Sequence, residues 1–110
     1  MALTSAATIA DQAPLTVYLR VRQGDSLAQQ VTATAVDWTG TYTVSLVRAG
    51  TTDTTSVTVA AALIGSDTVY TFTASDTATA ALDLGRHRVY VTETGDDHTY
   101  LAGWLEISAL

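Results

Sequence analysis

The 110-residue sequence contains no cysteine, no lysine and no asparagine, and it has a single proline. Without cysteine the chain can form no disulfide, no thiolate zinc site and no cysteine nucleophile. The lack of lysine and asparagine indicates a genome poor in A/T codons. The five cations are all arginines, and eleven acidic residues outnumber them, so the formal net charge is −6. Nucleic acids and anionic membranes require a positive surface, so neither is expected as a partner.

Long hydrophobic runs are also missing. The most apolar stretch, near residues 57–64, is interrupted by Thr58 and is rich in alanine, so it is far too short for a membrane span. The first residues, MALTSAATIADQAP, have neither the basic nor the hydrophobic segment of a signal peptide. We therefore expect a protein that is made in the cytoplasm without a membrane anchor. Its length is typical of one domain with its own core.

Strict alternation of apolar and polar residues is the strongest pattern in the chain. It begins after Pro14 and predicts a half-buried strand, because successive side chains of a strand point to opposite faces. Similar runs lie near residues 27–36, 42–48, 57–64, 70–74, 89–91 and 101–107. They are separated by the turn sequences QGDS, DWTG, RAGTTDTT, GSD and TGDD. About seven short strands with this spacing predict an all-β, two-sheet antiparallel immunoglobulin-like sandwich over residues 14–110.

One segment breaks the alternation. SDTATAALDLG offers Ser75 as a helix N-cap, Asp76 in the first turn and Gly85 as a left-handed terminator. We therefore expect one short helical turn near residues 75–84, crossing between the sheets. In the last strand, Gly103 fits neither face and is expected to mark a bulge.

The N-terminal residues 1–13 differ from the rest in composition. They are small and polar, with Leu3 and Ile9 as the apolar anchors. Such a segment is expected to need a neighbouring chain to become ordered. We interpret it as an arm that contacts another subunit.

Two groups of residues could carry chemistry. The sequence ETGDDH, Glu93 to His98, is acidic, but it lacks the ligand spacing of a calcium loop, so a solvated hairpin tip is expected. His87 and His98 could in principle join a catalytic triad, but no nucleophile motif accompanies them. We expect no catalytic residue, no metal and no cofactor.

The remaining candidates are interface residues. Arg20 with Arg22, and Arg86 with Arg88, alternate on strands, so each pair projects to one face, where it either solubilises the sheet or meets carboxylates of a neighbouring subunit. Trp104 is out of phase with the apolar residues of its strand, which places it on one face with Tyr100. That face is either covered by the other sheet or exposed as an aromatic interface. Trp38, in DWTG, is a candidate for the same kind of contact.

The order of four motifs carries a family resemblance. VRQGDS, DWTGTYTVSLVRAG, YTFTASDTATAALDLGRHRVYV and TYLAGWLEI resemble, in order and spacing, the small immunoglobulin-like modules of tailed-phage virions, such as the N-terminal domain of upper baseplate proteins. The resemblance covers roughly residues 15–107. One departure is His87, where the family often has tyrosine.

The resemblance implies a non-catalytic virion structural protein that contacts other virion proteins, namely tail, baseplate or major capsid subunits, in several copies. The leading hypothesis is an assembly subunit of the tail or baseplate region that uses the arm and the sandwich surface. A capsid decoration protein that stabilises the head is the alternative of the same class. A carbohydrate- or receptor-binding surface module, with Trp38 and Tyr100 as loop contacts, is the alternative of another class.

Overall fold

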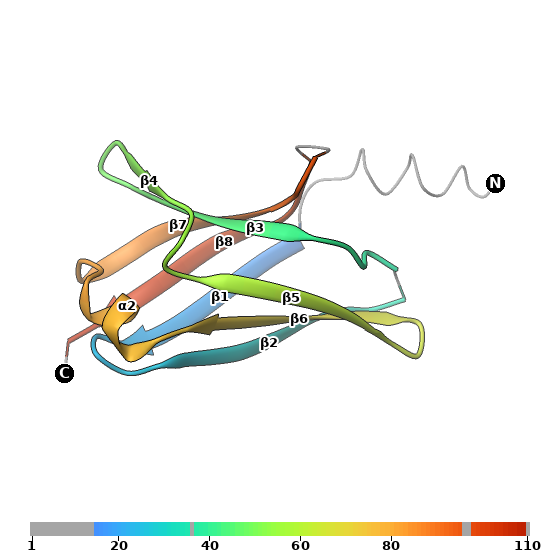
Figure 1. Ribbon diagram of the computed structural model, residues 1–110, viewed down its shortest axis with the longest axis horizontal. Helices are drawn as coiled ribbons and strands as arrows, with labels where there is room; N and C mark the ends of the chain where they lie inside the picture. The colour runs from blue at the N-terminus through green and yellow to red at the C-terminus, as the bar shows by residue number, and fades with distance from the viewer. Residues whose placement is uncertain (1–14, 36, 96–97, 110) are drawn as a thin grey trace.

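The computed structural model describes residues 15–35, 37–95 and 98–109, and this part of the chain folds as a two-layer β-sandwich (Figure 1). Its elements, in chain order, are β1 (Leu15–Arg22), β2 (Leu27–Ala33), β3 (Tyr42–Arg48), β4 (Thr51–Asp53), β5 (Thr58–Ile64), β6 (Asp67–Ala74), α2 (Asp76–Ala80), β7 (Gly85–Glu93) and β8 (Thr99–Ser108).

The strands form one larger and one smaller sheet. The five-stranded sheet has the order β1-β8-β7-β3-β4, and the three-stranded sheet has the order β2-β6-β5. Every pairing is antiparallel except that of β1 with β8, which is parallel. The expected immunoglobulin-like sandwich is thereby confirmed, with eight strands in the described residues instead of about seven.

The additional strand is β4, which lies in the segment expected to be a polar connection. Arg48 pairs with Thr51, so Ala49 and Gly50 form a two-residue hairpin loop. Both residues have positive φ, 52° and 82°, as a type I′ turn requires. The sequence predicts this hairpin only weakly, because alanine rarely occupies the first position of such a turn.

The core lies between the two sheets, where alternate residues of the strands point inward. The side chains with almost no exposed surface include Leu19, Tyr70, Phe72, Leu101 and Leu105. These positions agree with the alternation in the sequence. Burial of apolar side chains between two sheets is the main stabilising contribution to such a fold.

The crossover from β6 to β7 contains α2, at one end of the sandwich (Figure 1). Ser75 is its N-cap, as predicted, because its Oγ accepts a hydrogen bond of 3.1 Å from the Ala78 N–H. Gly85 does not terminate this helix: Ala81 caps it in right-handed conformation. Gly85 instead begins β7 with φ +108°, where an added Cβ would lie 2.7 Å from Nη1 of Arg48.

Thr79 fixes the helix to the β1–β2 turn. Its side chain is fully buried. The hydroxyl donates to the Asp25 carbonyl at 2.6 Å and accepts from the Gly24 N–H at 3.2 Å. These bonds satisfy turn groups that would otherwise lack a partner.

Gly103 does not mark a bulge, which corrects the expectation from sequence. It pairs in regular register with Val17 and Val89 and points toward the core. An added Cβ would lie 1.7 Å from the Val17 carbonyl oxygen, so glycine is required by close backbone approach. The register shift lies elsewhere in the β7–β8 pair, between Val91 and Thr92, where Tyr100 is the extra residue.

Candidate protein interface on the five-stranded sheet

The outer surface of the five-stranded sheet collects the arginines that the sequence places on two separate strands. β8 lies between β1 and β7, so Arg20 pairs with Glu106, and Glu106 pairs with Arg86. One row further along the strands, Tyr18, Trp104 and Arg88 are aligned in the same way. We call this surface the arginine–aromatic face; its residues are Tyr18, Arg20, Arg22, Arg86, Arg88, Tyr90, Trp104 and Glu106.

The prediction that each arginine pair projects to one face of its strand is confirmed. Arg20 and Arg22 are exposed on β1, and Arg86 and Arg88 are exposed on β7. The two pairs also share one face, which the sequence alone does not indicate, because it depends on both strands flanking β8.

Aromatic rings hold the arginines of β7 against the sheet. The guanidinium carbon of Arg88 lies 5.1 Å from the ring centroid of Trp104 and 5.7 Å from that of Tyr90. The guanidinium carbon of Arg86 lies 5.9 Å from the ring centroid of Trp104. Cation–π contacts of this kind stabilise by about 0.5–1 kcal/mol each at exposed sites. The rings therefore restrict the orientation of both guanidinium groups.

Glu106 is the one carboxylate on this face, and it accepts a hydrogen bond from the hydroxyl of Tyr18. This bond lowers the pKa of Glu106 below its ordinary value and raises the pKa of Tyr18 above its own. The neighbouring Arg20 and Arg86 lower the pKa of Glu106 further. Glu106 therefore stays ionised between two arginines and fixes the ring of Tyr18.

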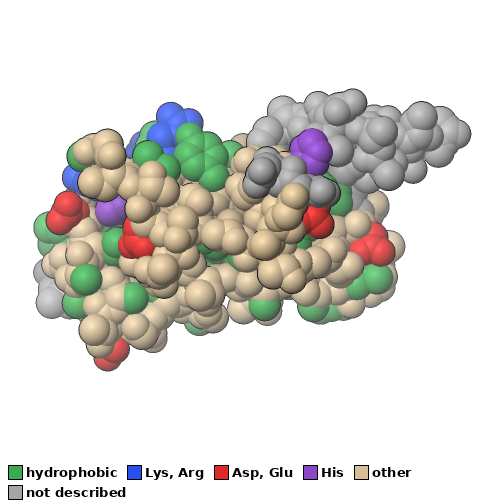
Figure 2. All heavy atoms as spheres, turned by 45° about the horizontal axis from the view of Figure 1, so that its top comes forward, with side chains coloured by type: hydrophobic (Ala, Val, Ile, Leu, Met, Phe, Trp, Pro, Cys, Tyr) green, Lys and Arg blue, Asp and Glu red, His purple; other side chains and the backbone are tan. Residues whose placement is uncertain are grey.

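The charge of the face opposes that of the whole protein. Four arginines and one glutamate give the face a net charge of +3, while the chain carries −6, so the rest of the sequence carries −9. Figure 2 shows arginine side chains beside hydrophobic side chains at one margin of the molecule, with carboxylates scattered elsewhere over the visible surface. Such a surface complements an acidic protein surface.

Trp38 and Tyr100 do not belong to this face. Trp38 is only 9% exposed and lies in the core, which removes it from the candidate surface contacts. The register shift in β8 directs Tyr100 toward the same region: its ring centroid lies 5.0 Å from that of Trp38 and 5.9 Å from that of Tyr42. The expectation that Tyr100 shares a face with Trp104 is therefore wrong.

The aromatic cluster at this end of the sandwich has a structural role. The hydroxyls of Tyr42 and Tyr70 both donate to the Trp38 carbonyl, and burial raises the pKa of both tyrosines. Trp38 and Tyr100 therefore lie together, as a ligand-binding module would need, but the Trp38 ring is buried in the core and is not available to a glycan.

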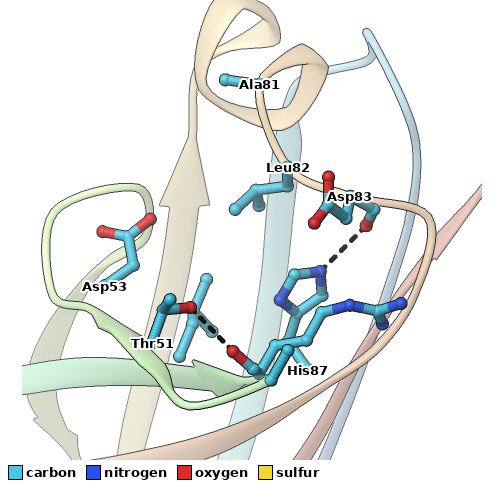
Figure 3. A pocket seen from close by; sticks show the side chains of 9 residues that line it. Thr51, Asp53, Ala81, Leu82, Asp83 and His87 are labelled. Carbon is cyan, nitrogen blue, oxygen red and sulfur yellow. Dashed lines mark hydrogen bonds between the residues drawn. The ribbon is translucent and has the colours of Figure 1, made fainter.

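A hollow of about 250 Å³ lies at the end of the sandwich between the β3–β4 hairpin and the segment after α2 (Figure 3). His87 is buried at its base, and a ring nitrogen lies 2.9 Å from the Asp83 carbonyl oxygen. This contact has the position and role of the tyrosine corner of immunoglobulin-like sandwiches, in which a side chain early in the strand binds backbone a few residues upstream. His87 therefore fixes the crossover.

The other polar groups around the hollow are also engaged in local turns. The Asp53 carboxylate accepts hydrogen bonds from the N–H and hydroxyl of Thr55 and from Ser56. Burial raises the pKa of Asp53, but these bonds outweigh it and lower the pKa overall. The hydroxyl of Thr51 donates to the Arg48 carbonyl at 2.7 Å (Figure 3). The bonds to Asp53 lie within the turn formed by residues 53–56 and stabilise its conformation.

Two sets of residues discussed in the sequence analysis lie outside the part of the chain that the structure describes. Leu3 and Ile9 of the proposed arm fall outside, as do Asp96 and Asp97 of the acidic hairpin. Within the described ranges, no three histidine, cysteine or acidic side chains come together as a metal site would require. The same ranges contain no helix with the length and hydropathy needed to cross a bilayer.

Sequence reasoning missed Tyr18, Tyr90 and Glu106 as members of the arginine–aromatic face. Each alternates in phase with an arginine or with Trp104 on its own strand, which is a usable signal once the strand order is known.

Comparison with known proteins adds no relative: no family model matches the chain, and neither the curated proteins nor the solved structures contain a significant match. Inference about function therefore depends on the geometry and on the resemblance in motif order.

Proposed function

We propose that this protein is a non-catalytic structural subunit of a tailed-phage particle, in the tail or baseplate region, which docks on an acidic surface of a neighbouring virion protein through its arginine–aromatic face. One observation carries the proposal: four of the five arginines, with the rings that orient them, lie on one face of a chain whose net charge is −6. The motif order supports the virion assignment.

The chemistry of the face suits protein docking better than other uses. Arginine and aromatic residues are enriched at protein interfaces, and arginine forms bidentate pairs with carboxylates. A net charge of +3 confined to one sheet face also steers an acidic partner toward it. The local hydrogen bonds around the hollow at Asp53 and His87 favour a non-catalytic role.

Incorporation into particles tests this proposal. Particles that lack the protein are incubated with wild-type protein or with Arg86→Ala/Arg88→Ala, and sedimentation with the particles is measured. The double variant should lose most incorporation, because it removes two charges and their ring contacts. Incorporation of the wild type should fall as salt is raised, since exposed charge pairs are screened.

Gln30→Glu/Thr32→Glu is the matched control. It changes the net charge by the same amount at exposed positions of β2, on the other sheet. It should incorporate like the wild type. Equal incorporation of the arginine variant and the wild type would show that this face does not dock. Electron microscopy of the reconstituted particles separates a tail or baseplate position from capsid decoration.

A further inference from the structure

The outer strand β5 leaves one edge of the three-stranded sheet open. Among the described strands, β5 pairs with β6 alone, and it is the last strand of its sheet. Five of its seven residues are exposed, including Leu63 at 48% and Ile64 at 63%. An open, apolar strand edge is a template for pairing with another strand.

The opposite side of the sandwich is closed. There, β1 and β2 are the edge strands of their sheets, and the Gln29 side chain bridges them. Its Nε2 donates to the Tyr18 carbonyl at 2.8 Å, and its Oε1 accepts from the Arg20 N–H at 3.3 Å. These are the main-chain groups that a further strand would use. The remaining edge belongs to the larger sheet: β4 has only three residues and covers β3 from Leu46 to Arg48, so among the described strands residues 42–45 of β3 also lie at an edge.

The β5 edge is also free of charge. No charged residue occurs between Asp53 and Asp67, the longest such interval in a chain of net charge −6. Two copies of this protein repel each other over most of their surfaces, but two β5 strands meet without opposing carboxylates. The small side chains of Ala60, Ala61 and Ala62 let the backbones approach closely.

We propose that β5 pairs edge to edge with β5 of a second copy of this chain, in antiparallel orientation, and so joins two three-stranded sheets into one of six strands. A two-fold axis at Ala61 places Leu63 opposite Val59 of the second copy and Ala60 opposite Ala62. The contact is isologous, because each strand supplies the same residues to the other. Exposed Leu63 and Ile64 are buried by this pairing. It uses a surface separate from the arginine–aromatic face and does not depend on the proposed function.

Sedimentation equilibrium of the full chain, from about 10 µM to about 1 mM, measures the association, since an interface this small forms a weak dimer. Ala60→Glu/Ala62→Glu places like charges opposite each other twice across the axis and should weaken dimerisation about tenfold. Ala60→Glu/Ala62→Lys places a glutamate opposite a lysine twice and should restore the dimer. This rescue requires the antiparallel register.

Gln30→Glu/Thr32→Glu is again the control, because these residues lie in the same rows of the sheet as Ala60 and Ala62, on the far side of β6. It should dimerise like the wild type, and circular dichroism should show that all variants are folded. A wild type that stays monomeric at about 1 mM would overturn the proposal. So would an unchanged dissociation constant in the double glutamate variant, or a failure of the glutamate–lysine variant to rescue.

Discussion

The two outer faces of the sandwich have the same pleated geometry and opposite chemistry. The arginine–aromatic face of the larger sheet presents oriented cations and rings. The outer face of the smaller sheet is built of small, uncharged residues, and we call it the threonine–alanine face: Ala28, Gln30, Thr32, Thr58, Ala60, Ala62, Ile64, Val69, Thr71 and Thr73.

Polar groups on the threonine–alanine face bond to one another. The hydroxyls of Thr58 and Thr73 lie 2.8 Å apart, and Nε2 of Gln30 lies 3.3 Å from Oγ1 of Thr71. The residues that define this face include no cation. The comparison teaches that alternation alone does not distinguish the two outer faces; the clustering of one residue type across neighbouring strands does.

The largest expected effect comes from Gly103→Ala. The added Cβ would collide with the Val17 carbonyl, so β1 must move away from β8 and carry Tyr18 with it. We expect the free energy of unfolding to fall by about 3 kcal/mol or more, measured by chemical denaturation. Ala62→Val, which adds volume to the exposed threonine–alanine face, should change it by less than about 0.5 kcal/mol. Similar midpoints for the two variants would contradict the close β1–β8 approach.

A smaller effect is expected for Trp104→Ala. This change removes the ring that Arg86 and Arg88 share, so the free energy of unfolding should fall by about 1–2 kcal/mol. The arginine side chains should also become more mobile, which NMR relaxation of their Nε–H groups measures. Thr71→Ala on the other face should leave both quantities nearly unchanged. Rigid arginines in Trp104→Ala would show that the ring does not orient them.

The two-residue hairpin turns of the sheets differ in strain. In the larger sheet Ala49 has φ 52°, whereas in the smaller sheet Gly65, between the paired Ile64 and Asp67, has φ 66°. Ala49→Asn should stabilise the protein by about 0.5–1 kcal/mol, because asparagine tolerates this conformation better. Gly65→Ala should destabilise it by about 1 kcal/mol. Thermal denaturation measures both, and shifts of the same sign would contradict the turn geometry.

The smallest expected effect concerns pH. Because the Tyr18 hydroxyl lowers the pKa of Glu106 from its ordinary value, this carboxylate contributes stability above its unfolded pKa, and the contribution is lost as pH falls through the folded value. Tyr18→Phe should raise the pKa of Glu106 toward the ordinary value, as measured by NMR titration of its side-chain carboxyl carbon. Thr71→Val, on the face without carboxylates, should leave it unchanged. An unaltered titration in Tyr18→Phe would mean that the bond is not maintained in solution.

Much of the fold could be predicted because its signals are local. Alternation located the strands, and Ser75 marked the helix start. β4 was missed because its turn uses alanine where glycine or asparagine is usual. The place of Gly103 in the register was missed because it depends on how closely β1 approaches, and no local pattern records that distance.

The candidate site was only half predictable. The exposure of Arg86 and Arg88 follows from alternation, but their meeting with Arg20 requires β8 between two strands far apart in sequence. Trp38 was misassigned because its turn sequence is typical of exposed loops, whereas the large ring closes one end of the core. Contacts between residues that are far apart in the sequence can be predicted only when the order of the strands in the sheet is known.

The parallel pairing of β1 with β8 determines how the sandwich responds to a pulling force. Leu15 pairs with Leu101 and Arg22 with Ser108, so the chain enters the sandwich at one end of this strand pair and leaves at the other. A pulling force applied at Leu15 and Ser108 acts along both strands and loads their hydrogen bonds together instead of opening them one after another. Extension between these two residues should therefore require the hydrogen bonds of this strand pair to break together.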